Sequence, residues 1–311
     1  MATGWKNWKS AVLGWARRKP TPSPVPPRPP RIGLALGGGF ARGMVHVGVL
    51  RVFRDNGIPV DCVAGVSAGA IAAATYASGR TCEEIARIAC SMRFTDVARW
   101  TIPWMGFAVS ERMDRFLRKS LQCHTFENMR VPLSVVATDV VTGKPVIFRD
   151  HGDVCLPIRA SCSYPGVFEP VRYGDQLLVD GAISMEVPAW AARDMGATLV
   201  IAVHLPAQPA VTAPSNVIQV LSRCFDIMHS RTEETWRRYA DIVLQPDIGG
   251  IAWDGFESGP QLIAAGEKAA IEALPAIRAY LDGAAGLPVI PVSVPKQPVA
   301  NQPALPALDR A

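Results

Sequence analysis

Residues 65–69 read Gly-Val-Ser-Ala-Gly, a G-x-S-x-G pattern with a hydroxyl at its centre. The apolar run 60–64 precedes it and an alanine-rich segment follows, so the pattern predicts a serine on a sharp turn between a strand and a helix. Such a turn strains the serine backbone and leaves no room for side chains at Gly65 and Gly69. Ser67 is therefore a candidate nucleophile, and an ordinary glycine-rich turn is the alternative.

A second glycine-rich segment, Leu-Gly-Gly-Gly-Phe-Ala-Arg-Gly at 36–43, also joins an expected strand to an expected helix. The bare N–H groups of Gly37, Gly38 and Gly39 and the positive end of the following helix predict an anion-binding loop. The anion is either a nucleotide phosphate or the oxyanion of an acyl-transfer intermediate beside Ser67. The glycine spacing matches neither a dinucleotide fingerprint nor a P-loop, which favours the oxyanion.

A serine nucleophile needs a base, and the residues offer two kinds. In the chain order of an α/β-hydrolase, His204 or His229 would follow the serine and the acid, whereas His46 suits a structural role. The competing base is Asp180, in Leu-Val-Asp-Gly-Ala at the end of an apolar strand, unless its Asp-Gly pair marks a hairpin turn. A carboxylate with an ordinary pKa of about 3.9 is a poor base, so Asp180 would need a dry site that raises its pKa. The pattern alone leaves the choice open.

The elements that must position these residues follow from short apolar runs alternating with helical patterns. Because several apolar strands are each followed by a helix, we expect an α/β domain with a mostly parallel sheet covered on both faces. The predicted strands are 32–36, 60–64, 133–138, 146–148, 176–179, 198–204 and 242–244. The predicted helices are 41–56, 68–78, one after Thr81 with Glu84 as capping partner, 111–120, 188–195, 216–239 and 260–282.

Residues 1–19 combine tryptophan with lysine at helical spacing. Trp5, Trp8, Val12 and Trp15 fall on one face of a helix. Tryptophan prefers the headgroup boundary and lysine is drawn to anionic lipid, so one interpretation is a peripheral membrane anchor. A frayed terminus, or a helix docked on its own domain or on a partner subunit, is the other interpretation.

Proline-rich stretches bound the main domain. Residues 20–31 form a predicted extended linker, because seven of the eleven residues from 20 to 30 are proline. Residues 286–311 are again proline-rich and lack a helical or strand period, so we expect a tail with no core of its own. The chemistry-bearing motifs therefore belong to a single domain over residues 32–285.

The composition excludes several classes of protein. The net charge is +5, but the first 31 residues hold seven basic residues and no acid, so the near-neutral remainder argues against nucleic-acid binding. Seven cysteines without a C-x-x-C pair indicate neither a disulfide framework nor a zinc site. Because no secretory signal or long apolar run is found, we expect a cytoplasmic protein, peripherally membrane-associated if residues 1–19 act as an anchor.

Three motifs in this order, at 37–43, 65–69 and 180–182, resemble those of the patatin-like phospholipases, particularly the bacterial members similar to the catalytic domain of neuropathy target esterase. Shorter stretches agree, namely Ala137-Thr138-Asp139 with Thr142-Gly143, Ile158-Arg159-Ala160-Ser161 with Tyr164-Pro165-Gly166-Val167-Phe168, and Ala240-Asp241-Ile242-Val243. The resemblance covers about residues 32–282. It implies a three-layer patatin-like fold.

The resemblance also implies a serine–aspartate dyad without a histidine, which decides the base. The base would take the serine proton, the oxygen would attack an acyl ester, and water activated by the same carboxylate would release the fatty acid. The implied substrate is a phospholipid or lysophospholipid in lipid catabolism, and neither a cofactor nor a metal is implied. The implied site residues are Ser67 as nucleophile, Asp180 as base, Gly37, Gly38 and Gly39 as oxyanion-hole amides, Arg42 and Gly43 in support of that loop, and Gly65 and Gly69 in the turn around the nucleophile.

Three residues depart from the family's usual pattern. Phe40 stands where many members carry a further glycine, and we expect it to narrow the acyl pocket or add an apolar contact. Glu186 stands where relatives often have asparagine, and His204 where aspartate or asparagine is usual. Neither Glu186 nor His204 is a position of the dyad, so these two departures concern its surroundings. His204 stays a minor candidate for assisting the site.

Two other functions are compatible with the motifs. One is a soluble carboxylesterase or thioesterase that uses Ser67 on short acyl chains. The other is a non-catalytic regulator with the same fold that binds lipid, which the intact Ser67, Asp180 and glycine loop argue against. A nucleotide-binding protein is a more distant alternative because of the glycine spacing.

Overall fold

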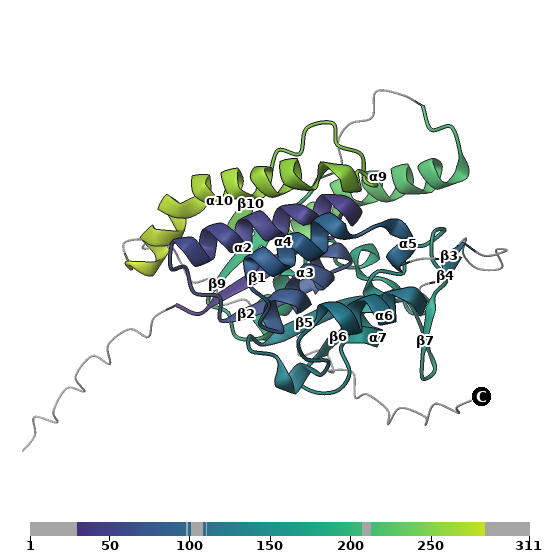
Figure 1. The fold of residues 1–311 in the computed structure, drawn as a ribbon, viewed down its shortest axis with the longest axis horizontal. Helices are drawn as coiled ribbons and strands as arrows, with labels where there is room; N and C mark the ends of the chain where they lie inside the picture. The colour runs from purple at the N-terminus through teal and green to yellow at the C-terminus, as the bar shows by residue number, and fades with distance from the viewer. Residues whose placement is uncertain (1–29, 98, 101–107, 110, 207–212, 284–311) are drawn as a thin grey trace, which may run out of the picture.

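The computed structural model describes residues 30–97, 99–100, 108–109, 111–206 and 213–283, built around a mixed sheet (Figure 1). The strand order is β10-β9-β1-β2-β5-β8-β7, and β6 also pairs with β5. Strands β1, β2, β5, β9 and β10 pair in parallel, whereas β6, β7 and β8 are antiparallel, which confirms the mostly parallel sheet. The strands are β1 Ile32–Leu36, β2 Cys62–Val66, β5 Leu133–Asp139, β6 Pro145–Arg149, β7 Val171–Tyr173, β8 Gln176–Asp180, β9 Leu199–Val203 and β10 Ile242–Leu244, with a separate pair β3 Arg99–Trp100 and β4 Ala108–Val109.

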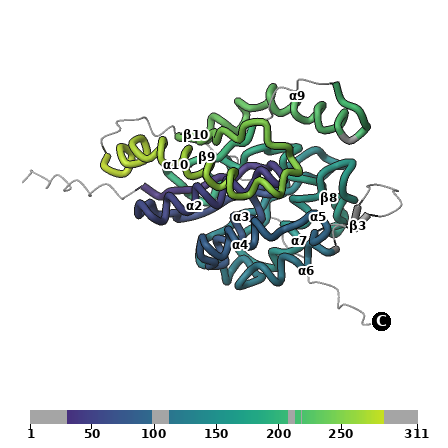
Figure 2. Tube along the Cα trace, turned by 45° about the horizontal axis from the view of Figure 1, so that its top comes forward, coloured from purple at the N-terminus to yellow at the C-terminus, as the bar shows by residue number. Residues whose placement is uncertain are grey.

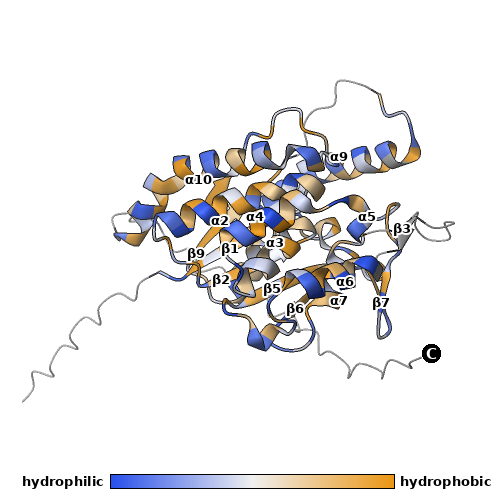
Figure 3. Ribbon diagram, in the orientation of Figure 1, coloured by the Kyte–Doolittle hydropathy of each residue, from blue (hydrophilic) through white to orange (hydrophobic). Residues whose placement is uncertain are grey.

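Helices cover both faces of the sheet and complete three layers. Alternate residues of β1 enter the two cores, Leu34 packing with α2, α3 and α10, and Ala35 with α8 and Trp236 of α9. In Figure 3 the strands are largely apolar while the covering helices show both colours, as expected for amphipathic layers. The helices are η1 Phe40–Met44, α2 Val45–Asp55, α3 Ala68–Ala77, α4 Cys82–Ser91, α5 Phe94–Val97, α6 Glu111–Ser120, η2 Phe126–Asn128, α7 Cys155–Ser161, η3 Gly181–Ile183, α8 Ala189–Asp194, α9 Val217–Arg237, η4 Phe256–Ser258 and α10 Gly259–Leu281.

Most predicted elements are present, and the differences have local causes. The capping box of Thr81 and Glu84 is confirmed, whereas β2 begins two residues later than predicted, at Cys62. The predicted helix 41–56 is divided into η1 and α2. The sequence did not indicate α7, because its first turn contains Pro157 and its N-cap Val154 offers no capping side chain.

Most residues of the predicted end segments lie outside the part of the chain that the structure describes. Residues 1–19, residues 286–311 and all but the last two residues of 20–31 fall outside the described residues, so the anchor, linker and tail stay predictions. Among the helices that the structure describes, none combines the length and the apolar character needed to cross a bilayer.

Helices α2 and α10 pack backbone to backbone at two glycines. A Cβ atom on Gly48 would overlap the carbonyl oxygen of Ile263, and one on Gly266 would overlap that of Val45. Since real side-chain atoms do not approach so closely, any larger residue at either position would force the helices apart. This crossing holds α2, and with it the glycine loop that precedes α2, against the rest of the domain.

We expect Gly48→Ala to destabilise the protein by about 1–3 kcal/mol, because the methyl group overpacks the crossing. A loss of stability would be informative, because replacing glycine by alanine in an exposed helix normally stabilises the protein by roughly 0.5–1 kcal/mol. Urea denaturation of both proteins measures the difference. Gly250→Ala is the control, because a Cβ there meets no atom of the described residues within 4 Å. Equal stability of the Gly48 variant and the wild type would contradict the close packing.

Candidate active site

Ser67 occupies a strained turn between β2 and α3. Its φ of 53° and ψ of −127° lie in a region that residues with side chains rarely adopt. The turn is tight, because a Cβ on Gly65 would lie 2.5 Å from Ala70 Cα and one on Gly69 would overlap the carbonyl oxygen of Leu36. The geometry is that of the predicted strand–turn–helix, with glycines where side chains would collide.

A buried serine on α7 holds this turn in place. The backbone N–H of Ser67 donates to Ser161 Oγ at 2.8 Å, and that hydroxyl donates to the carbonyl oxygen of Val136 at 2.6 Å. Ser161 thus ties the strained turn to β5. No local pattern indicates this role of Ser161, although the stretch 158–161 is part of the family resemblance.

Asp180 reaches Ser67 because of the sheet register. Val66 pairs with Val136 and Asp180 pairs with Ala137, so Ser67 and Asp180 stand level on opposite sides of β5. The Ser67 hydroxyl donates to Asp180 Oδ2 at 2.7 Å. The other carboxylate oxygen accepts from the N–H of Ala182 at 2.9 Å. Asp180 opens the short helix η3 instead of a hairpin turn.

Burial changes the acidity of Asp180. Its side chain has no solvent exposure, and this burial raises the pKa to about 7, although the hydrogen bonds from Ser67 and Ala182 favour the charged form. Both of these hydrogen bonds come from uncharged donors, so neither supplies Asp180 with a counterion. At neutral pH the carboxyl group is therefore poised to accept a proton from its hydroxyl neighbour.

The glycine loop lies against Ser67, with one correction to the expected donors. A Cβ on Gly38 would come within 3.2 Å of Ser67 Cβ, so the loop backbone closely approaches the serine. Gly37 is not a free donor, because its N–H donates to the carbonyl oxygen of Val203 at 3.1 Å. Among the described residues, no backbone acceptor is recorded for the N–H groups of Gly38 and Gly39. The N–H groups of these two glycines are therefore available to donate hydrogen bonds to an oxyanion.

Residues around the loop fix its shape. His46 donates from Nε2 to the carbonyl oxygen of Gly37 at 2.9 Å, and burial lowers the pKa of His46 to about 4, so it stays neutral. The N–H of Arg42 donates to the Gly39 carbonyl oxygen at 3.1 Å. Gly43 allows close contact with α3, because a Cβ there would lie 2.6 Å from Ala68 Cβ. Arg42 thus supports the loop through its main chain.

Two cavities of different character meet at Ser67. The larger, of about 490 Å³, also reaches Asp180, and its polar wall includes Arg42, Arg223 and Asp226. Arg42 Nε is buried there and has no hydrogen-bond partner among the described residues. The smaller cavity, of about 40 Å³, is lined almost wholly by apolar side chains. These are Phe40, Ile71, Met92, Phe94, Val97, Met113, Phe168 and Phe256, with Ala68 and Cys162.

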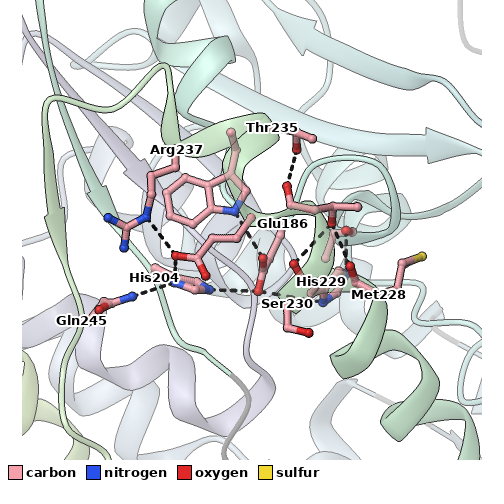
Figure 4. Close-up of polar contacts among 12 residues, drawn as sticks. Glu186, His204, Met228, His229, Ser230, Thr235, Arg237 and Gln245 are labelled. Atoms are coloured by element: carbon pink, nitrogen blue, oxygen red, sulfur yellow. Dashed lines mark hydrogen bonds and ion pairs between the residues drawn. The ribbon is translucent and has the colours of Figure 1, made fainter.

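The histidines considered as bases lie elsewhere. His204 Nε2 donates to Glu186 Oε1 at 3.0 Å, and His229 Nε2 donates to the carbonyl oxygen of Ala182 at 3.0 Å (Figure 4). No hydrogen bond joins either ring to Ser67 in the described part of the chain. The carboxylate of Asp180 is thus the basic group in contact with the serine. The described residues also include no group of three or more His, Cys, Asp or Glu side chains that could hold a metal ion.

The chain is similar to proteins of one family. Residues 34–193 match the family model described as patatin-like phospholipase. An uncharacterised NTE family protein of Mycobacterium bovis is 34% identical over 217 residues, which are 65% of this chain and 60% of that protein. The mouse patatin-like phospholipase domain-containing protein 6 is 33% identical over 185 residues, which are 57% of this chain and 14% of that protein. VipD from Legionella pneumophila has a TM-score of 0.44 at 13% identity, covering 83% of this chain and 67% of VipD.

The extent of these matches differs between this chain and its relatives. The chain spans about 60% of the length of the first mycobacterial relatives that it matches. The family model, in contrast, extends over more than half of this chain, and its matched segment contains the glycine loop, Ser67 and Asp180. The chain therefore belongs to the patatin-like phospholipase family.

Proposed function

We propose that this protein is a serine acyl hydrolase that cleaves fatty-acyl esters of phospholipids or lysophospholipids, in lipid catabolism. The observation that carries the proposal is the 2.7 Å hydrogen bond from the Ser67 hydroxyl to the fully buried Asp180. A serine in hydrogen-bond contact with a carboxylate of raised pKa is an activated nucleophile. The family membership supports the lipid ester as substrate.

In the first half of the reaction the ester carbonyl lies between Ser67 and the glycine loop. Asp180 takes the hydroxyl proton while Ser67 Oγ attacks the carbonyl carbon, and the negative charge moves to the carbonyl oxygen. The N–H groups of Gly38 and Gly39 stabilise that oxyanion. Collapse of the intermediate transfers the proton from Asp180 to the leaving alcohol and leaves an acyl group on Ser67.

In the second half, water replaces the alcohol. Asp180, again a carboxylate, takes a proton from the water, and the resulting hydroxide attacks the acyl-serine carbonyl. The same two amides stabilise the second oxyanion, and the proton returns to Ser67 as the fatty acid leaves. One carboxylate serves both steps, because its pKa of about 7 lets it exchange a proton in either direction near neutral pH.

The two cavities give the substrate an orientation. We place the first part of an acyl chain in the apolar cavity beside Phe40 and Met92, and the polar part of the lipid in the larger cavity beside Arg42 and Arg223. The Phe40 ring packs edge-on against Tyr164 and Trp253, with centroid distances of 5.5 and 4.8 Å. Phe40 thus forms the boundary between the two cavities. Membrane contact through residues 1–19 stays a further part of the proposal.

A short-chain esterase or thioesterase is the second candidate. The apolar cavity at Ser67 measures about 40 Å³, and a second apolar cavity of about 50 Å³, which shares Phe40, Ile71 and Met92 with it, is separate in this structure. The small first cavity favours short acyl chains. A preference for dispersed short esters over micellar lipid would decide for this candidate.

We expect Ser67→Ala and Asp180→Asn each to lower turnover by a factor of about 10³ or more, because each removes one partner of the dyad. Hydrolysis of a defined phospholipid set measures the loss. Ser78→Ala is the matched control, since Ser78 is a buried serine at the far end of the same helix and donates to Thr75. Failure of a fluorophosphonate probe to label Ser67 in the wild type would instead support a non-catalytic lipid-binding regulator.

The pH dependence of kcat/KM should reflect the titration of the Asp180 carboxyl group. Because the base acts as a carboxylate with a pKa of about 7, kcat/KM should fall as the pH drops below 7 and level off above it. Burial raises the pKa of Cys162 well above its usual value and that of Tyr164 to about 12, so neither of these two neighbours titrates in that range. A pH–rate profile with an uncharged ester gives the measurement. An acid limb near pH 4 would show that Asp180 has an ordinary pKa.

Phe40→Ala should shift the preference toward longer acyl chains. Removing the ring joins the two apolar cavities that Phe40 borders, while the Ala side chain keeps a Cβ at the same positive φ of 51°. We expect kcat/KM for long-chain esters to rise about tenfold relative to short ones, the effect of one or two buried methylenes. A series of esters of increasing chain length gives the profile, with the shortest as internal reference. An unchanged profile would place the acyl chain elsewhere.

A further inference from the structure

A buried polar cluster joins α9 to the sheet beside the larger cavity (Figure 4). We define the Glu186 cluster as Glu186, His204, Trp236 and Gln245. Glu186 accepts from His204 Nε2 at 3.0 Å and from Trp236 Nε1 at 3.3 Å, and Gln245 Nε2 donates to His204 Nδ1 at 3.2 Å. Each of these groups therefore has a partner. The cluster holds the C-terminal half of α9, which lies at the outer edge of the molecule in Figure 2, against the ends of β9 and β10.

His229, two turns before Trp236 on α9, faces the loop that follows the proposed base. Its Nε2 donates to the carbonyl oxygen of Ala182 at 3.0 Å. Its other ring nitrogen lies 3.9 Å from Glu186 Oε1. The N–H of the same Ala182 donates to Asp180 Oδ1 at 2.9 Å. Two hydrogen bonds through one residue thus connect the histidine to the carboxylate.

The position of Ala182 depends on contacts from outside its own loop. The helix η3 has only three residues, so its internal hydrogen bonds give it little rigidity. Since α9 is fixed by the Glu186 cluster, His229 offers Ala182 a rigid donor. A shift of Ala182 would weaken a bond to the Asp180 carboxylate, and in a dry site such a bond is strong.

We propose that His229 is a positioning residue for Asp180, acting through the main chain of Ala182. The inference rests on the proposed function, because it concerns the base of that reaction. His229 lies outside the dyad but also lines the larger cavity, so the test must separate two effects: loss of a positioning contact lowers kcat, whereas loss of a substrate contact raises KM. From chain order alone, the same residue is a candidate for a direct base.

The acidity of Asp180 gives this role a specific signature. The hydrogen bond from Ala182 lowers the pKa of Asp180 against the effect of burial. Losing His229 should loosen that bond, raise the pKa further and move the acid limb of the pH–rate profile to higher pH. The charged groups that face His229 are Glu186 and Asp226. Two titratable side chains near Asp180, Cys162 and Tyr164, have pKa values raised by burial and stay neutral in the range concerned.

The test compares His229→Ala and His229→Gln with the wild type, using a soluble uncharged ester between pH 5 and 9. We expect the alanine variant to lower kcat about five- to tenfold, the effect of losing one hydrogen bond, with KM little changed and the acid limb shifted upward. Glutamine can still donate to the Ala182 carbonyl, so it should restore most of kcat and the original limb. Ser230→Ala is the matched control, because the neighbouring Ser230 is exposed and its hydroxyl donates to the Ile227 carbonyl oxygen of the same helix.

The outcomes separate this inference from the proposed function. If the wild type hydrolyses no ester and is not labelled by a fluorophosphonate, the proposed function fails. If the wild type is active and His229→Ala keeps its kcat and acid limb, only the role of His229 fails. A loss in His229→Ala with an unshifted limb and no recovery in His229→Gln would also overturn it, because it would indicate a general effect on folding.

Discussion

The hydrogen bond between the Ser67 hydroxyl and the buried carboxylate of Asp180 is the interaction on which the site depends. A carboxylate in water would hold its proton too weakly to act on a hydroxyl, and burial removes that obstacle by raising the pKa to about 7. The same burial disfavours the charged form in the folded protein, and this cost must be offset elsewhere. Bonds from Ser67 and Ala182 offset part of it.

The sheet supplies the precision that this short bond needs. Ser67 and Asp180 come from strands on either side of β5, and their level position follows from two pairing registers. A slip of one residue in either pairing would turn the side chains to the other face. Thr138 also fixes the backbone of Asp180, because its hydroxyl donates to the carbonyl oxygen of Asp180 at 2.9 Å. Strain at Ser67, of the order of 1–3 kcal/mol for such a backbone, is tolerated because these contacts over-determine the turn.

Part of this site can be predicted from local sequence patterns. The rest depends on contacts between residues that are far apart in the sequence. The turn around Ser67 was predictable because its glycines, strand and helix are neighbours in sequence. Asp180 was chosen only through the family resemblance, since nothing local separates a buried carboxylate from an Asp-Gly turn. Gly37 looked like a free donor, but β9 uses its N–H. Ser161 is 94 residues from Ser67, and His229 is 47 from Ala182, so no spacing could pair them.

The chemistry and the shape of the site come from different parts of the chain. The segment that matches the family model, 34–193, contains the dyad and the glycine loop, whereas α9 begins at Val217. Yet α9 contributes Arg223 and Asp226 to the polar wall of the larger cavity. Burial raises the pKa of Asp226 although Arg42 and Arg223 lower it, so this carboxylate is partly shielded from water. The polar part of the proposed lipid substrate would meet partly buried charges here, which interact more strongly than charges fully exposed to water. From the proposed placement of the substrate, we expect changes in α9 to alter substrate choice while the dyad stays intact.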